Sequence, residues 1–176
     1  QKFIESVPWD KKIIFAPDRL LGQYLIKQTG RKMVLWHGTC QVHEIFSERE
    51  LIRFKTKHTE AKVLAHPECE ENILMHADFI GSTSALIKHA NETEDLKYII
   101  ATEPGVIHQM QKTSPQKEFF PLPTNTGCAC NECPHMRLNT MEKIIDSLEN
   151  MKHEIVLDEA LRQRALKPIT KMLEII

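Results

Sequence analysis

Residues that could do chemistry collect in four short motifs, each of which follows a short apolar run. The motifs are residues 37–40 (HGTC), 66–69 (HPEC), 81–84 (GSTS) and 102–105 (TEPG). Ordinary loops are rich in Gly, Asn and Asp, whereas these motifs offer thiols, imidazoles, a carboxylate and hydroxyls. Turn chemistry and helix capping would explain any one motif alone. Their recurrence after successive strands predicts a functional site.

The HPEC motif places an imidazole and a carboxylate two residues apart. In a locally extended segment, the side chains of His66 and Glu68 would point the same way, and Pro67 would stiffen the turn. Such a pair is suited to acid/base catalysis. A solvated pair of loop residues explains the pattern equally well.

The GSTS motif could form an anion site. Ser82 and Thr83 precede an apolar helical run, where hydroxyls and free backbone N–H groups at the positive helix end suit a phosphate or a carboxylate. An ordinary N-cap with Gly81 in the turn explains the same spacing and is the commoner arrangement.

Five cysteines stand at positions 40, 69, 128, 130 and 133. An odd number in a sequence without an export signal argues against a disulfide framework and favours a metal site or thiol chemistry. The CACNEC loop (128–133) fits neither a standard zinc finger nor a ferredoxin run, so only some of its thiols need be ligands. Cys40 alone would ordinarily be a small buried apolar residue, and His43 and Glu44 could equally lie on the surface.

Short apolar runs alternate with helical patterns along residues 11–123. The expected strands are residues 11–17, 32–36, 62–65, 78–80, 97–101 and 117–121, and the expected helices are about residues 19–29, 47–57, 70–76, 85–90, 106–111, 138–151 and 158–176. Repeated strand–helix units predict parallel sheets with helices on both faces, and therefore an α/β fold. Ligands bind beyond the carboxyl ends of such strands, where the four motifs stand.

Charge and hydropathy limit the partners. The chain has 23 Lys+Arg against 24 Asp+Glu and a formal net charge of -1, which gives no electrostatic support for nucleic-acid or anionic-membrane binding. It contains no apolar run near the roughly 20 residues that cross a bilayer. We therefore expect small-molecule or protein partners and a cytoplasmic location.

Six longer strings carry a resemblance to a known family. They are WHGTCQVHE (36–44), AKVLAHPEC (61–69), ADFIGSTSALIKHA (77–90), ATEPGVIHQM (101–110), CPHMRLNTMEKI (133–144) and RALKPITKML (164–173). In order and spacing they resemble quinolinate synthase. That enzyme condenses iminoaspartate (iminosuccinate) with dihydroxyacetone phosphate, with loss of phosphate and water, in de novo NAD biosynthesis.

The resemblance implies repeated small three-layer α/β/α sandwich domains with parallel sheets, arranged around a [4Fe-4S] cluster. Residues 1–40 would be the C-terminal half of the family's second domain, and residues 41–123 its complete third domain. Residues 124–176 would hold a cluster-ligand loop and helices that return to the first domain, which lies outside these 176 residues.

The resemblance also implies roles for individual residues. Cys40 and Cys133 match cluster ligands, and a third cysteine is expected in an N-terminal region outside this sequence; Cys69 is not a ligand. Glu68 and His66 match catalytic residues, with Glu68 the better candidate for proton transfer. The implied substrate-binding residues are His66, Pro67, Glu68, Ser82, Thr83 and Thr102.

The implied enzyme is a condensing and dehydrating transferase that uses the cluster as a Lewis acid. An aspartate oxidase or dehydrogenase would supply iminoaspartate. We expect the 176 residues alone to be inactive, because further substrate ligands would lie outside them. One alternative is an inert fragment of the synthase, and another is a non-catalytic zinc or redox-switch module that uses Cys128, Cys130 and Cys133.

Overall fold

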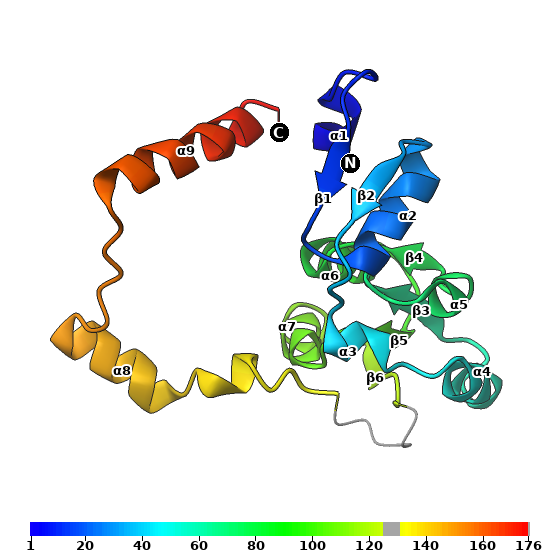
Figure 1. Ribbon diagram of the computed structural model, residues 1–176. Helices are drawn as coiled ribbons and strands as arrows, with labels where there is room; N and C mark the ends of the chain where they lie inside the picture. The colour runs from blue at the N-terminus through cyan, green and yellow to red at the C-terminus, as the bar shows by residue number, and fades with distance from the viewer. Residues whose placement is uncertain (125–130, 176) are drawn as a thin grey trace.

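The chain forms two parallel β-sheets flanked by helices, followed by a helical C-terminal arm (Figure 1). The computed structural model describes residues 1–124 and 131–175. The first sheet pairs β1 (Ile13–Phe15) with β2 (Met33–Leu35). The second has the order β4-β3-β5-β6 and consists of β3 (Lys62–Ala65), β4 (Phe79–Ile80), β5 (Lys97–Ala101) and β6 (Glu118–Pro121). All pairings between named strands are parallel, so the predicted α/β class is confirmed.

The four-stranded sheet is buried on both faces at its centre. Tyr98, Ile99, Ile100 and Ala101 of β5 are all fully inaccessible to solvent. Helices must cover both faces of a parallel sheet, so a central strand is apolar at consecutive positions instead of alternating. This accounts for the continuous apolar runs in the sequence of β3 and β5.

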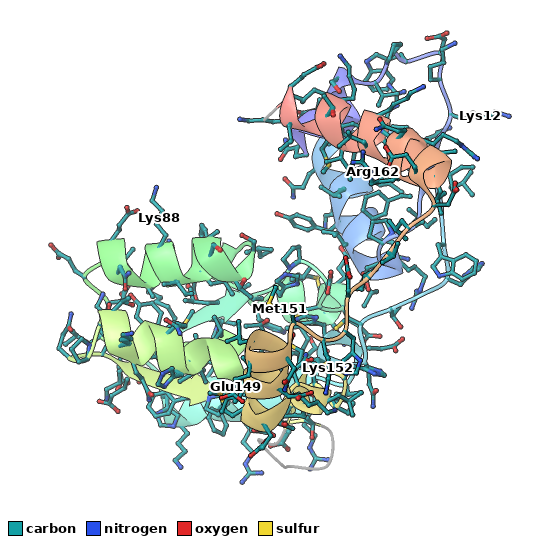
Figure 2. The ribbon with its side chains drawn as sticks, turned by 90° about the vertical axis from the view of Figure 1, so that its left-hand side faces the viewer. Lys12, Lys88, Glu149, Met151, Lys152 and Arg162 are labelled. Atoms are coloured by element: carbon teal, nitrogen blue, oxygen red, sulfur yellow. The ribbon has the colours of Figure 1, made fainter. Side chains whose placement is uncertain are left out.

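Two pairs of helices cover the two faces. α4 (Glu48–Lys57) and α5 (Glu71–Leu74) pack on the face formed by Val63, Ala65 and Ile99. α6 (Thr83–Glu92) and α7 (Gly105–Thr113) pack on the opposite face. Figure 2 shows α6 and α7 side by side, with Lys88 directed away from α7 into solvent. Residues 41–123 therefore contain a three-layer α/β/α sandwich.

α2 (Arg19–Thr29) connects β1 to β2 and begins and ends where the sequence predicts. The Asp18 carboxylate accepts a hydrogen bond from the Leu21 N–H at 2.7 Å, and Gly30 ends the helix with φ of 68°. Gly22 faces the sheet so closely that a Cβ there would lie 2.5 Å from Leu35 Cδ2. The helix can pack on β1 and β2 because this position has no side chain.

The C-terminal arm stands away from both sheets (Figure 1). It contains a 3₁₀ turn (Met136–Leu138), α8 (Met141–Asn150) and α9 (Glu159–Leu173), and none of their residues is buried. Figure 2 shows Met151 and Lys152 in the connection between α8 and α9. Both helices leave apolar side chains exposed: Met141, Ile144, Ile145, Leu148, Leu161, Leu166, Ile169, Met172 and Leu173.

Two short helices were not expected from the sequence. They are α1 (Lys2–Ser6) and α3 (Gln41–Glu44), which span 5 and 4 residues. Such lengths are too short to show a helical period in the sequence. Among the described residues, no helix is long and apolar enough to cross a membrane.

Candidate active site

Glu68 is the centre of a cluster of polar side chains at the carboxyl edge of the larger sheet. Its Oε2 atom lies 3.1 Å from Nδ1 of His43 and 3.7 Å from Nδ1 of His66. The side chain is 22% exposed. The carboxylate is therefore held between two imidazoles and remains open to a ligand. His66 and Glu68 lie close together as expected, although residues 67–69 form a turn instead of the expected extended segment.

His43 lies on α3 and is almost fully buried, with 6% of its surface exposed. Its Nε2 atom is 2.9 Å from the hydroxyl of Thr102, and its ring stacks on that of His66 with centroids 4.5 Å apart. Nδ1 has no aligned hydrogen bond, because its contact with Glu68 is close but poorly directed. Thr102 thus fixes the orientation of the ring through Nε2.

Cys40 precedes α3 and is half-buried. Its backbone N–H donates to Oδ2 of Asp18 at 2.8 Å, while Oδ1 of the same carboxylate caps α2. One donor atom from each of Cys40, His43 and Glu68 lies within 4.8 Å of the other two. The segment after β2 thereby brings a thiol and an imidazole to the carboxylate that follows β3 of the larger sheet.

Asp18 connects the start of α2 to the backbone of Cys40, so its substitution tests how much this connection stabilises the fold. The carboxylate is 3% exposed and accepts two backbone hydrogen bonds. We expect Asp18→Ala to lower the free energy of unfolding by about 2 kcal/mol, because it removes a helix cap and leaves the Cys40 amide unpaired. Urea unfolding followed by circular dichroism measures the change.

Asp158→Ala is the matched control, since Asp158 caps α9 through the Leu161 N–H at 3.0 Å. No residue of α9 is buried, so the midpoint of the cooperative transition should not move. If both variants lowered the free energy of unfolding by the same amount, loss of a helix cap alone would account for the effect of Asp18→Ala. The hydrogen bond from Cys40 would then contribute nothing.

The surroundings shift the protonation of three groups. The contact with His43 lowers the pKa of the Glu68 carboxyl, and the nearby His66 adds to this effect against partial burial. Burial lowers the pKa of the His66 imidazole, and the positive charge that His43 can carry lowers it further. Burial raises the pKa of the Cys40 thiol. Near neutral pH, the site therefore holds an anionic Glu68, a neutral His66 and a protonated Cys40.

Backbone hydrogen bonds align three of the four motifs. The Ala101 carbonyl accepts from the His66 N–H at 3.1 Å and from the Cys69 thiol at 3.3 Å. The Gly81 N–H donates to the Ala65 carbonyl at 3.1 Å. Cys69 is 1% exposed and burial raises the pKa of its thiol strongly, so it is poorly suited to bind a metal.

The remaining predicted substrate residues take different positions. Pro67 is buried in the turn beside Glu68, while Ser82 and Thr83 are exposed at the start of α6. The Ser82 hydroxyl accepts from the Ala85 N–H at 3.3 Å, as an N-cap does. Among the described contacts, none joins Ser82 or Thr83 to the Glu68 cluster, although they lie at the same edge of the sheet.

Cys133 is half-buried and separate from the Cys40 group. Two residues before it, the buried Asn131 amide donates to the carbonyl of Val42, which is two residues after Cys40. This bond holds the start of the C-terminal arm against α3. Cys128 and Cys130 lie outside the described residues.

Sequence reasoning missed His43, which it left open as a possible surface residue together with Glu44. Glu44 is exposed and accepts from the Thr39 hydroxyl at 2.9 Å, whereas His43 is buried at the centre of the site. The available signal was the spacing of Cys40 and His43, because residues three apart lie on the same face of a helix.

The family model described as quinolinate synthetase A protein matches residues 1–174. The chain belongs to this family.

Curated members of the family are about half identical to the chain. It is 53% identical over 174 residues to a quinolinate synthase from Trichodesmium erythraeum and 56% identical over 172 residues to one from Synechocystis. It is 55% identical over 173 residues to one from Chloroherpeton thalassium. Each match covers 98% or 99% of this chain and 54% of the relative. The chain thus spans about half the length of the curated relatives it matches.

Proposed function

We propose that residues 1–176 form part of a quinolinate synthase that condenses iminoaspartate with dihydroxyacetone phosphate and releases phosphate and water. The observation that carries the proposal is the family match over residues 1–174. The cluster of Glu68, His43 and His66 at the edge of the sheet supports it, because a condensation with two dehydrations needs groups that move protons.

Glu68 is the proposed proton-transfer residue. Its anionic form can accept a proton, and the adjacent His43 stabilises that form. His66 is held beside it as a neutral imidazole, which can donate to or accept from a substrate oxygen. Thr102 contributes by orienting His43 through Nε2.

Ser82 and Thr83 are the proposed anion-binding residues. They lie exposed at the N-terminus of a ten-residue helix, where backbone N–H groups and the helix dipole favour a phosphate or a carboxylate. Pro67 is buried in the turn beside Glu68 and is the proposed support for the substrate at that position.

Cys40 and Cys133 are the proposed protein ligands of a [4Fe-4S] cluster, with a third cysteine from outside the 176 residues. The donor set fits, because both thiols are half-buried, belong to segments joined by the Asn131–Val42 hydrogen bond and form no disulfide. When bound, a cluster with one iron free of thiolate supplies a Lewis acid that polarises a substrate oxygen.

The domain assignment follows the two sheets. We propose that residues 1–40 complete an α/β domain begun elsewhere, that residues 41–123 are a full domain, and that residues 124–176 carry a ligand loop and helices. The exposed apolar side chains of α8 and α9 support packing of these helices against a region outside the chain.

The proposed partners are the two small-molecule substrates, together with an aspartate oxidase or dehydrogenase that supplies iminoaspartate. We propose a cytoplasmic location, where a small-molecule biosynthetic enzyme of this kind would act. From the net charge of -1, we propose no interaction with nucleic acid or membrane.

The test is an anaerobic assay of a full-length protein that contains residues 1–176, reconstituted with iron and sulfide. It should form quinolinate and phosphate in equal amounts from iminoaspartate and dihydroxyacetone phosphate. Residues 1–176 alone should form none, because a ligand and substrate contacts are proposed to lie elsewhere. An iron-loaded full-length protein without product would refute the proposed activity.

A further inference from the structure

We propose that Cys40, His43 and Glu68 bind one zinc-like divalent cation when no cluster is present. This would be a mononuclear site, distinct from a cluster because two of its three ligands are not cysteines. Binding of the cation does not depend on the proposed enzyme activity. Its consequence, exclusion of the cluster from Cys40, does rest on the proposed function.

The first observation is the unsatisfied nitrogen of His43. Nδ1 is buried and has no aligned hydrogen bond, yet it lies 3.1 Å from the Glu68 carboxylate. In the metal-free site, a proton on Nδ1 lets His43 stabilise the Glu68 carboxylate. When the ring proton instead lies on Nε2 and is donated to Thr102, Nδ1 presents a lone pair to the same oxygen. Two electron-rich atoms at this distance require a cation to bridge them, which is either a proton or a metal ion.

The second observation is the geometry of the donor atoms. Two ligands bound to zinc at about 2.0–2.1 Å and a tetrahedral angle lie roughly 3.3 Å apart, close to the 3.1 Å between His43 and Glu68. The Cys40 donor lies within 4.8 Å of both. Rotation about the Cys40 side chain, which is only half-buried, closes the remaining separation.

The third observation is the support behind each ligand. The Thr102 hydroxyl holds His43 through its other nitrogen, and the buried Asp18 carboxylate holds the Cys40 backbone. Such outer partners orient metal ligands and are characteristic of built sites. A thiolate, an imidazole and a carboxylate with an open fourth position suit zinc better than Mg²⁺ or Ca²⁺.

A zinc-like ion in this site would occupy two groups that the proposed enzyme needs. Cys40 would be unavailable to the cluster, and Glu68 would be unavailable for proton transfer. The site therefore provides a route by which a divalent cation competes with cluster assembly in the cluster-free protein.

The experiment titrates Co²⁺ into reduced residues 1–176 that have been stripped of metal with a chelator and kept anaerobic. One Co²⁺ per chain should bind and give a thiolate-to-cobalt charge-transfer band, and Zn²⁺ should remove the band by displacement. Cys40→Ser should abolish the band. Thr102→Val should weaken binding by about 10–100-fold at unchanged stoichiometry.

The matched controls are Cys69→Ser and Cys133→Ser, which should retain the cobalt band. A band that survives Cys40→Ser and disappears in Cys133→Ser would assign the metal to the cysteine loop and overturn the proposal. Absence of any binding by a natively folded chain would show that a proton alone bridges His43 and Glu68.

Alkylation of the unaltered chain gives a second test, which does not depend on whether the Cys40→Ser variant folds. In the unaltered chain, Zn²⁺ should slow the reaction of Cys40 with iodoacetamide and leave that of Cys133 unchanged, as measured by mass spectrometry of the labelled peptides. Equal rates at Cys40 with and without Zn²⁺ would overturn the proposal.

Discussion

Glu68→Gln in a full-length protein that contains this chain is expected to lower kcat for quinolinate formation by about 10²–10⁴-fold, the usual contribution of a general acid or base. The amide keeps the shape of the side chain and removes its ability to take up a proton. Because Glu68 is 22% exposed, the substitution should leave the fold intact. Rates are measured anaerobically, with iron content and circular dichroism checked in parallel.

Glu71→Gln is the control for this experiment. Glu71 begins α5 three residues further along and forms an exposed ion pair with Lys27, which contributes little to stability. The Glu71→Gln variant should form quinolinate at the same rate as the unaltered protein. If the Glu68 variant, loaded with iron, also turned over at that rate, Glu68 could not be the proton-transfer residue.

Cys40→Ser and Cys133→Ser are expected to abolish the visible iron–sulfur absorption of the reconstituted full-length protein. A cluster iron requires thiolate ligands, and a serine hydroxyl does not replace one at neutral pH. Absorption spectra and iron and sulfide content, recorded after anaerobic reconstitution, measure the loss.

Cys69→Ser should keep the cluster, because Cys69 is fully buried and its thiol donates to the Ala101 carbonyl. This comparison separates the loss of a ligand from the general effect of removing a cysteine. A cluster of normal intensity in the Cys133 variant would remove Cys133 from the ligand set, and the loop would then need another role.

The site lies where the two sheets meet, and this position bears on both experiments. Asp18 follows β1 and Cys40 follows β2 of the smaller sheet. The other three residues follow strands of the larger sheet: His66, Glu68 and Thr102. A cavity of about 180 Å³ lies between α2 and α5, which the Lys27–Glu71 ion pair joins. Changes in the relative position of the sheets would therefore alter the distance from Cys40 to Glu68.

Much of the fold follows from local sequence. The Asp18 cap and Gly30 define α2 at the predicted residues, Ser47 caps α4, and β3 and β5 have the predicted bounds. These features depend on the backbone and on near neighbours in the chain, so their signals are local. The expectation that HPEC and TEPG lie at one edge also follows, because parallel strands carry their carboxyl ends to the same side.

The sequence by itself thus determined the α/β class, most of the elements, the family resemblance and the position of the motifs after successive strands. Only the tertiary structure decided that His43 is buried against Glu68, that Thr102 orients His43 and that Asp18 holds Cys40. The physical reason is register: Ala65 pairs with Ala101, so His66 and Thr102 follow paired positions, and α3 packs above them. Contacts between residues 59 positions apart, such as His43 and Thr102, depend on how whole elements pack, and no local pattern encodes them.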